Sequence, residues 1–166
     1  MKKFISVTLA IILTLTMLVG CGKKELPNPS KSKDPINLLP ILTIEGGKIA
    51  SLSKDEFLEI PQNEFEIKRT NSKGVTTNAK YKGVKWVDLS KAIGAENATK
   101  VTLIASDGYE KAYDIATLTT GNSIFAIYQD GKNISPSPLE GQIWFCADES
   151  LTANYWSKYV NKIKIE

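Results

Sequence analysis

Two cysteines, Cys21 and Cys146, are the only side chains of this chain that could act as thiol nucleophiles or as thiolate metal ligands. The chain has no histidine. Ser-His-Asp triads and Cys-His pairs, which need imidazole as the base, are therefore excluded, and so are the usual zinc sites. Whether either thiol is reactive therefore depends on the surroundings of these two cysteines.

Cys146 lies in an apolar segment, residues 142–147 (QIWFCA). Free cysteine is among the most buried residue types and packs like a small hydrophobic side chain, so we expect Cys146 to belong to the core. The alternative is a thiol that faces a pocket and reacts because its surroundings depress its pKa.

Cys21 follows a segment with the build of a secretory signal peptide. Two lysines precede a long uncharged apolar run, and residues 18–21 (LVGC) resemble the bacterial lipobox, whose cysteine is lipidated and becomes the mature N-terminus. We therefore predict that residues 1–20 are a lipoprotein signal peptide and that acylated Cys21 holds the protein on the extracytoplasmic side of the cell membrane. An uncleaved N-terminal anchor is the alternative, although the apolar run is slightly shorter than the roughly 20 residues that span a bilayer.

The residues behind the lipobox divide into a polar tether and one domain. Residues 21–38 are rich in Lys, Pro, Ser and Asn and have little to bury, which predicts a flexible tether. Residues 39–166 are long enough for one domain with its own hydrophobic core. The formal net charge is +3, two of these charges come from Lys2 and Lys3, and Arg69 is the only arginine. This is not the basic footprint of a nucleic-acid-binding protein.

Short apolar and alternating segments predict a mostly β, α+β domain with two short helices. Ser53 and Glu56 have the spacing of a capping box, which predicts a helix that Pro61 ends. A second helix should end at Gly94. Its buried face is predicted to be Trp86, Leu89, Ala92 and Ile93. Strands are predicted for residues 41–44, 48–52, 64–68, 75–81, 101–105, 109–115, 124–128, 142–147 and 156–165. The last strand should alternate, with Tyr159, Asn161, Ile163 and Ile165 on one face.

Several of these segments occur in the order of a known family. Residues 81–89 (YKGVKWVDL) resemble the "GV-L-DLL" segment of the molybdopterin-binding domain of sulfite-oxidase-type oxidoreductases. Residues 105–109 are similar to the family's "ADGY" hairpin. Residues 127–132 and 138–141 are similar to its "NGKPL…EHGGPL" stretch, and residues 157–163 are similar to its closing strand "VKWLTRI". The resemblance covers about residues 41–166 and implies the mixed sheets of that domain.

The chain departs from this family at positions that carry its chemistry. In catalytic members a cysteine ahead of the "GV" segment binds molybdenum, whereas residues 65–72 of this chain contain no cysteine. Trp144 aligns with the arginine of the family's "GGPLR" motif, and the histidines around the pterin phosphate and the metal have no counterpart. Losing these donors removes charge-assisted contacts to an anionic cofactor. The resemblance thus supports the fold and argues against molybdenum chemistry.

The resemblance also suggests where a ligand would bind. The candidate residues are Ser106, Asp107 and Tyr109 in the predicted hairpin, Glu140 in the Pro/Ser loop, and Trp156, Lys158 and Lys162 near the C-terminus. Alternation along the last strand places Lys158 and Lys162 on one face, where the resemblance suggests contact with an anion. Each of these segments also has a purely structural interpretation. Residues 106–109 would form a hairpin turn, and Lys158 and Lys162 would be solvated charges. Trp156 would belong to the core or to a platform on which a planar ligand stacks. We assign no catalytic residue and no metal site.

Together these observations predict a membrane-anchored lipoprotein that keeps the scaffold without molybdenum redox chemistry. We expect the domain to bind a small ligand or a partner protein, with the lipid membrane as partner through Cys21 and without a cofactor. The first alternative is a divergent oxidoreductase that uses molybdopterin or another pterin, with Cys146 or backbone groups replacing the missing ligands. The second is an interaction domain without a ligand.

Overall fold

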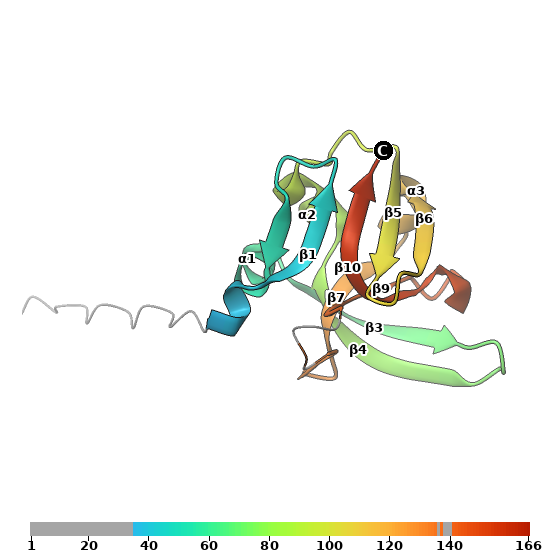
Figure 1. The fold of residues 1–166 in the computed structure, drawn as a ribbon. Coiled ribbons are helices and arrows are strands. Elements are labelled where there is room, and N and C mark those ends of the chain that lie inside the picture. Colours follow the sequence, from blue (N-terminus) through green and yellow to red (C-terminus); the bar gives the residue numbers. More distant parts are fainter. Residues whose placement is uncertain (1–34, 136, 138–140) are drawn as a thin grey trace, which may run out of the picture. The chain divides into compact units, whose positions relative to one another are not determined.

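A ten-stranded mixed sheet dominates the computed structural model, which describes residues 35–135, 137 and 141–166. These residues belong to one compact unit, Lys33–Glu166. The strands are β1 (Pro40–Glu45), β2 (Ser51–Ser53), β3 (Asn63–Thr70), β4 (Thr76–Val84), β5 (Lys100–Ala105), β6 (Glu110–Asp114), β7 (Ile124–Gln129), β8 (Lys132–Asn133), β9 (Ile143–Cys146) and β10 (Ser157–Ile165). Figure 1 shows β1, β10, β5 and β6 side by side, with the long β3–β4 hairpin below them.

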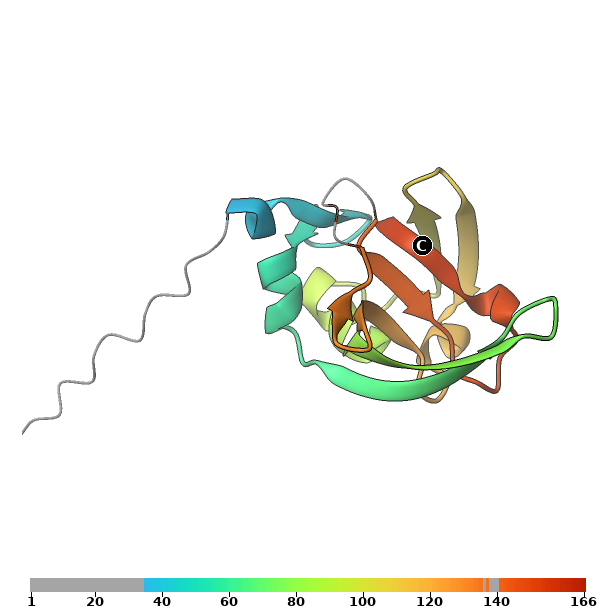
Figure 2. The same cartoon turned by 90° about the horizontal axis from the view of Figure 1, so that it is seen from below.

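The strand order is β2-β1-β10-β9-β7-β4-β3, and β5 also pairs with β10 and carries β6. The first half of β10 pairs with β9 and its second half with β1, while β5 runs along its other edge. Only the β1–β10 pair is parallel among the described strands. β3 ends the order, and Figures 1 and 2 both show the far end of the β3–β4 hairpin beside the short turn Ala153–Tyr155.

Three short α-helices accompany the sheet: α1 (Lys54–Glu59), α2 (Trp86–Ile93) and α3 (Ile115–Thr119), with 3-10 turns at Pro35–Leu38 and Ala153–Tyr155. The predicted capping box of α1 is present, because the Ser53 hydroxyl accepts from the Glu56 N–H and the Glu56 carboxylate accepts from the Ser53 N–H. α3 was not predicted, because five residues are too few to show a helical period. In the part of the chain that is described, no helix is long and apolar enough to cross a membrane.

α2 ends where predicted, at Gly94, which adopts a left-handed conformation with φ of 72°. Its buried side chains are Trp86, Leu89, Ser90 and Ile93. Ala92, predicted to be buried, is exposed. The helical period explains the difference, since positions i, i+3, i+4 and i+7 share a face and position i+6 lies beside it.

β10 does not follow the alternation predicted from the sequence. Ser157 pairs with Phe145 and Val160 with Ile143, so two residues of β10 lie opposite Trp144 alone. A second register shift follows against β5. Such bulges change which side chains face the core. Val160 and Ile163 are consequently buried, whereas Tyr159 and Asn161 are exposed.

The centre of the core is aromatic. Phe125 on β7 and Phe145 on β9 are fully buried, with ring centroids 5.1 Å apart. Trp86 of α2 packs 5.9 Å from Phe125, and Tyr113 of β6 packs 5.1 Å from Phe145. These contacts connect α2, β7, β9 and β6, so the core holds β9, one of the strands that carry the candidate site, in place.

Candidate functional site

The only arginine of the chain lies near the end of β3, on the inward face of the β3–β4 hairpin. Strand residues alternate between faces, so Arg69 shares the face of Ile67, which is 1% exposed. The Arg69 Cζ lies 5.4 Å from the ring centroid of Trp156. Its Nε is buried and finds no acceptor among the described residues. An unsatisfied buried donor costs about 1–3 kcal/mol, so this placement is unfavourable by itself.

A second cation approaches from the first bulge of β10. Lys158 and Tyr159 are the two residues that lie opposite Trp144, and both contact its ring. The Lys158 Nζ lies 4.0 Å from the indole centroid, and the Tyr159 ring meets the indole edge-on at 5.6 Å. The contact with Lys158 is a favourable cation–π interaction. The indole N–H of Trp144 is nevertheless buried without an acceptor in the described part of the chain.

The positive charge of Arg69 acts on Lys158. Burial lowers the pKa of Lys158, and the charge of Arg69 lowers it further. No carboxylate of the described residues forms an ion pair with either cation. Two half-buried like charges are unfavourable without a counter-charge. We call the residues of this site the cationic cluster: Arg69, Tyr81, Trp144, Trp156 and Lys158.

Tyr81 and Cys146 form the buried side of this site. The Tyr81 ring meets Trp156 edge-on at 5.3 Å, and burial raises the pKa of Tyr81 to about 12. Cys146 is fully buried, and burial raises the pKa of its thiol well above the usual value, although the charges of Lys158 and Arg69 act in the opposite direction. Its Sγ donates weakly to the Trp144 carbonyl, 3.9 Å away. Both side chains are therefore neutral at physiological pH.

We predict that thiol reagents do not reach Cys146 in the folded protein. The thiolate is the reactive form, and Cys146 is both neutral and 0% exposed. In a Cys21→Ser background, where it is the only cysteine, labelling by a disulfide reagent should be at least about a thousandfold slower than in the urea-unfolded chain. Fast labelling under native conditions would instead support the reactive-thiol interpretation.

The structure brings together two of the residues predicted to bind a ligand, Trp156 and Lys158, and leaves others apart. The Nζ of Lys162 lies 3.3 Å from the Glu45 carboxylate on β1, so this lysine already has a partner. Lys158 contacts the Trp144 ring and Lys162 pairs with Glu45, so the two lysines do not share a partner. Glu140 lies outside the described residues.

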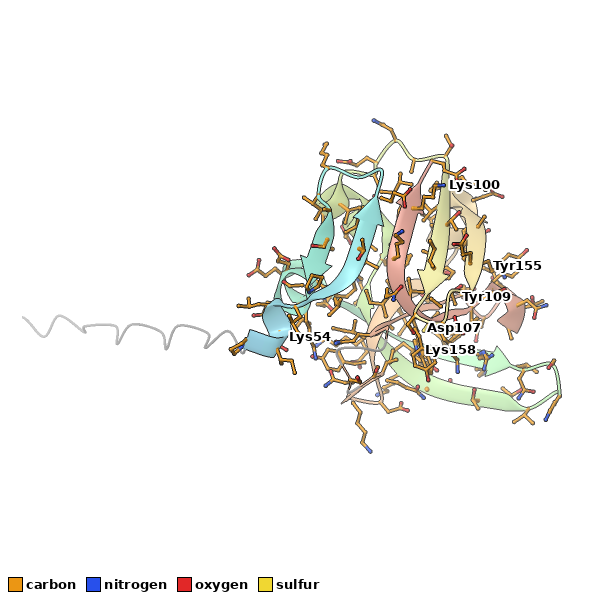
Figure 3. The ribbon with its side chains drawn as sticks, in the orientation of Figure 1. Lys54, Lys100, Asp107, Tyr109, Tyr155 and Lys158 are labelled. Carbon is orange, nitrogen blue, oxygen red and sulfur yellow. The ribbon has the colours of Figure 1, made fainter. Side chains whose placement is uncertain are left out.

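The predicted hairpin residues lie beside the bulge of β10. The Ser106 N–H donates to the Tyr159 carbonyl at 2.9 Å. The Asp107 carboxylate accepts the Tyr109 N–H at 3.0 Å, so it stabilises the turn, and Tyr109 is 59% exposed. Figure 3 shows Asp107, Tyr109 and Lys158 at this end of the sheet. The turn therefore lies beside the cationic cluster, and the Asp107 carboxylate stabilises the turn itself.

Arg69, Trp144 and Tyr81 were not among the ligand contacts predicted from the sequence. One signal was present, because Arg69 has the same parity as Phe65 and Ile67 in a strand with a buried face. A charged side chain at a position that strand alternation assigns to the buried face requires an explanation. Trp144 could not be assigned in the same way, since its contacts depend on the bulge in β10.

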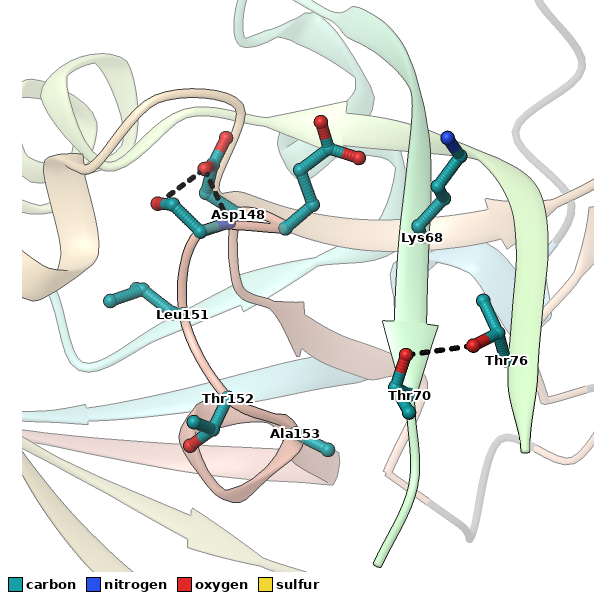
Figure 4. Close-up of a pocket in the computed structure, with 9 residues that line it drawn as sticks. Lys68, Thr70, Thr76, Asp148, Leu151, Thr152 and Ala153 are labelled. Carbon is teal, nitrogen blue, oxygen red and sulfur yellow. Dashed lines mark hydrogen bonds between the residues drawn. The ribbon is translucent and has the colours of Figure 1, made fainter. Parts of the chain in front are cut away.

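A separate open groove lies between the β3–β4 hairpin and the loop that follows β9 (Figure 4). Its volume is about 870 Å³, and it is lined by Lys68, Thr70, Thr76 and residues 148–153. The Asp148 carboxylate accepts hydrogen bonds from the Asn122 N–H and from the N–H and hydroxyl of Ser150. The groove has the volume of a ligand pocket. However, the Asp148 carboxylate is already used to stabilise the loop. None of the lining side chains has a buried hydrogen-bond donor without an acceptor.

Comparisons with known proteins identify the fold. No protein-family model matches the chain, and no curated protein matches it. The structure is similar to the crystal structure of the sulfane dehydrogenase SoxCD from Paracoccus pantotrophus, with a TM-score of 0.57 and 13% sequence identity. The match covers 75% of this chain and 37% of that chain. This confirms the predicted fold, a mostly β mixed sheet of the sulfite-oxidase type with few short helices, and it shows the fold alone.

The described residues do not fit a molybdenum centre of the kind the resemblance implies. Residues 65–72, where that family has its metal-binding thiolate, contain no cysteine, and the Arg69 guanidinium in this segment has donors only and no lone pair for a metal. The one described thiol, Cys146, is buried and neutral. Among the described residues, no group of three His, Cys, Asp or Glu side chains is placed to hold a metal.

Proposed function

We propose that this chain is a lipid-anchored, extracytoplasmic protein whose sulfite-oxidase-like domain binds a small ligand and does not carry out molybdenum redox chemistry. The observation that supports the proposal best is the position of Arg69. Its guanidinium lies inside the hairpin, over Trp156, in the segment where the resemblance expects the metal ligand. A retained scaffold whose residues 65–72 carry a cation and no thiolate favours binding over redox catalysis.

The first alternative is a divergent oxidoreductase that uses molybdopterin or another pterin. It requires Cys146 or backbone groups to replace the missing thiolate. The raised pKa of Cys146 disfavours this function, because metal ligation needs the deprotonated thiol. The second alternative, an interaction domain without a ligand, is disfavoured by the orphaned donors of Arg69 and Trp144, since polar groups buried without partners are rare unless they serve a purpose.

Metal analysis of the natively purified full-length protein tests this proposal. We expect molybdenum far below one atom per chain and no absorbance band beyond that of tryptophan and tyrosine, because the donor set lacks an accessible thiolate. Elemental analysis and an absorbance spectrum measure both. Stoichiometric molybdenum, or a pterin released on denaturation, would overturn the proposal in favour of the oxidoreductase.

A further inference from the structure

β3 is an edge strand, and every second residue along it has backbone groups that point away from the sheet. The Lys80 carbonyl accepts from the Asp130 N–H, and the Lys80 N–H donates to the Asp130 carboxylate, so the backbone of Lys80 faces β7. Glu66 is opposite Lys80 in the β3–β4 register, and its own N–H and C=O therefore face away from β4. The same alternation gives four such positions, which we call the edge residues: Glu64, Glu66, Lys68 and Thr70.

The outer edge of β3 is open. No described residue is hydrogen-bonded to the outward N–H and C=O groups of the edge residues, whose side chains are exposed. Figure 4 shows Thr76 of β4 on one side of β3 and the loop of residues 148–153 on the other side, across the open groove. Lys68 and Thr70 line this groove. The second half of the edge is therefore accessible to another strand.

The charges of the edge residues indicate which strand fits. Two copies of β3 can pair antiparallel about a two-fold axis, and an axis at Ile67 is the one that pairs all four edge residues with one another. This axis sets Glu66 opposite Lys68 of the second copy, twice over, and Glu64 opposite the uncharged Thr70. An axis at Glu66 or at Lys68 would instead set two like charges directly opposite each other, which is destabilising.

We propose that a second copy of this chain pairs with β3, edge to edge and antiparallel, around a two-fold axis at Ile67. The two edges would satisfy each other's open main-chain groups, as in strand addition, and the two Glu66–Lys68 pairs would select the register. The Glu66 carboxylate is already held on the exposed face, because it accepts from the Asn78 side chain. The inference is independent of the ligand, the lipid anchor and the absence of molybdenum.

The structural alternative is that the charges keep β3 unpaired. Charged side chains on edge strands commonly prevent pairing with other chains. Charges of one sign would do this best, since they repel a second copy in every register. β3 instead carries an acid and a base at the two positions that meet around Ile67, so its pattern is self-complementary.

The test begins with sedimentation equilibrium of the detergent-solubilised full-length protein over a series of concentrations. We expect a monomer–dimer equilibrium. Amide hydrogen exchange identifies the interface, because unpaired edge amides exchange rapidly and paired ones slowly. The amides of Glu66 and Lys68 should become protected as the dimer forms.

Charge reversals test the register. Glu66→Lys and Lys68→Glu each set like charges opposite each other at two places, so each should weaken the dimer about tenfold or more. A mixture of these two variants should dimerise, because the two basic positions of one chain then lie opposite the two acidic positions of the other. The double variant Glu66→Lys/Lys68→Glu should associate within about threefold of the original chain.

Glu64→Lys is the matched control. It makes the same charge change on the same face of β3, and Glu64 lies opposite Lys82 as Glu66 lies opposite Lys80. In the proposed register it meets Thr70, so the dimer should change by less than about threefold. Thermal unfolding shows that each variant is folded, and a mixed dimer shows it directly.

Four outcomes would overturn the inference. They are a monomer at every concentration, equal weakening by Glu64→Lys and Glu66→Lys, failure of the two single variants to dimerise when mixed, and a dimer whose Glu66 and Lys68 amides still exchange rapidly. A monomer in which these amides are protected would assign the edge to another part of the same chain. Stoichiometric molybdenum would remove the proposed function and leave this inference untouched.

Discussion

A Cys21→Ser variant is expected to leave the membrane fraction and appear among soluble extracytoplasmic proteins. The lipobox-like residues 18–21 (LVGC) supply the thiol on which a lipid would be built, and serine cannot form the thioether. Each buried CH₂ of an acyl chain contributes about 0.8 kcal/mol, so two chains give stable anchoring and their loss changes the partition by orders of magnitude. Fractionation after a carbonate wash, with incorporation of labelled palmitate, measures the effect.

Cys146→Ala is the matched control for this experiment. It removes the other cysteine of the chain, which lies in the core, and should leave the protein in the membrane fraction. Retention of Cys21→Ser in the membrane after the wash would contradict the lipid anchor and favour an uncleaved N-terminal segment.

Gly83→Ala is expected to lower the free energy of unfolding by at least about 3 kcal/mol. A Cβ at this position would lie 2.0 Å from the Phe125 carbonyl oxygen and 2.6 Å from the Ala126 Cα, which are backbone atoms of the neighbouring strand β7. Backbone cannot move aside without breaking the β4–β7 pairing, whose register already shifts between Lys82 and Gly83. Urea unfolding followed by circular dichroism measures the loss.

Gly74→Ala is the control for the general cost of replacing glycine. Gly74 has a φ of 76°, and a Cβ there would meet no atom within 4 Å. The variant should therefore lose only about 1 kcal/mol, the cost of a left-handed conformation for alanine. Equal losses in the two variants would show that the close approach of β7 to Gly83 is not what makes this position sensitive. The glycine of the "GV" segment would then owe its importance to something other than strand packing.

The elements that the sequence predicted well depend on residues a few positions apart. The capping box of α1 needs only Ser53 and Glu56, and the end of α2 needs only Gly94. The hairpin turn at Asp107 is likewise local, with the Gly108 N–H donating to the Ala105 carbonyl. Such signals can be recognised in a sequence because the interacting groups lie within one turn of chain.

The elements that the sequence predicted badly depend on partners far away in the chain. The alternation expected for β10 was wrong because two register shifts, against β9 and β5, change which residues face the core. Nothing near Tyr159 in the sequence announces them. A bulge arises when two strands are fitted together, so it depends on both strands.

By itself, the sequence determined which chemistries are open to this protein. Without histidine, it excludes Ser-His-Asp triads, Cys-His pairs and the usual zinc sites whatever the fold, and it contains one arginine and two cysteines, one of them in a lipobox-like segment. Only the tertiary structure decided where the remaining charges meet. Arg69 and Lys158 become neighbours because the β3–β4 hairpin places its inward face near β9 and β10, and because the bulge of β10 sets Lys158 against Trp144. Residue types are fixed by the chain, whereas the approach of two cations that form no ion pair with a described carboxylate depends on strand pairing across the whole sheet.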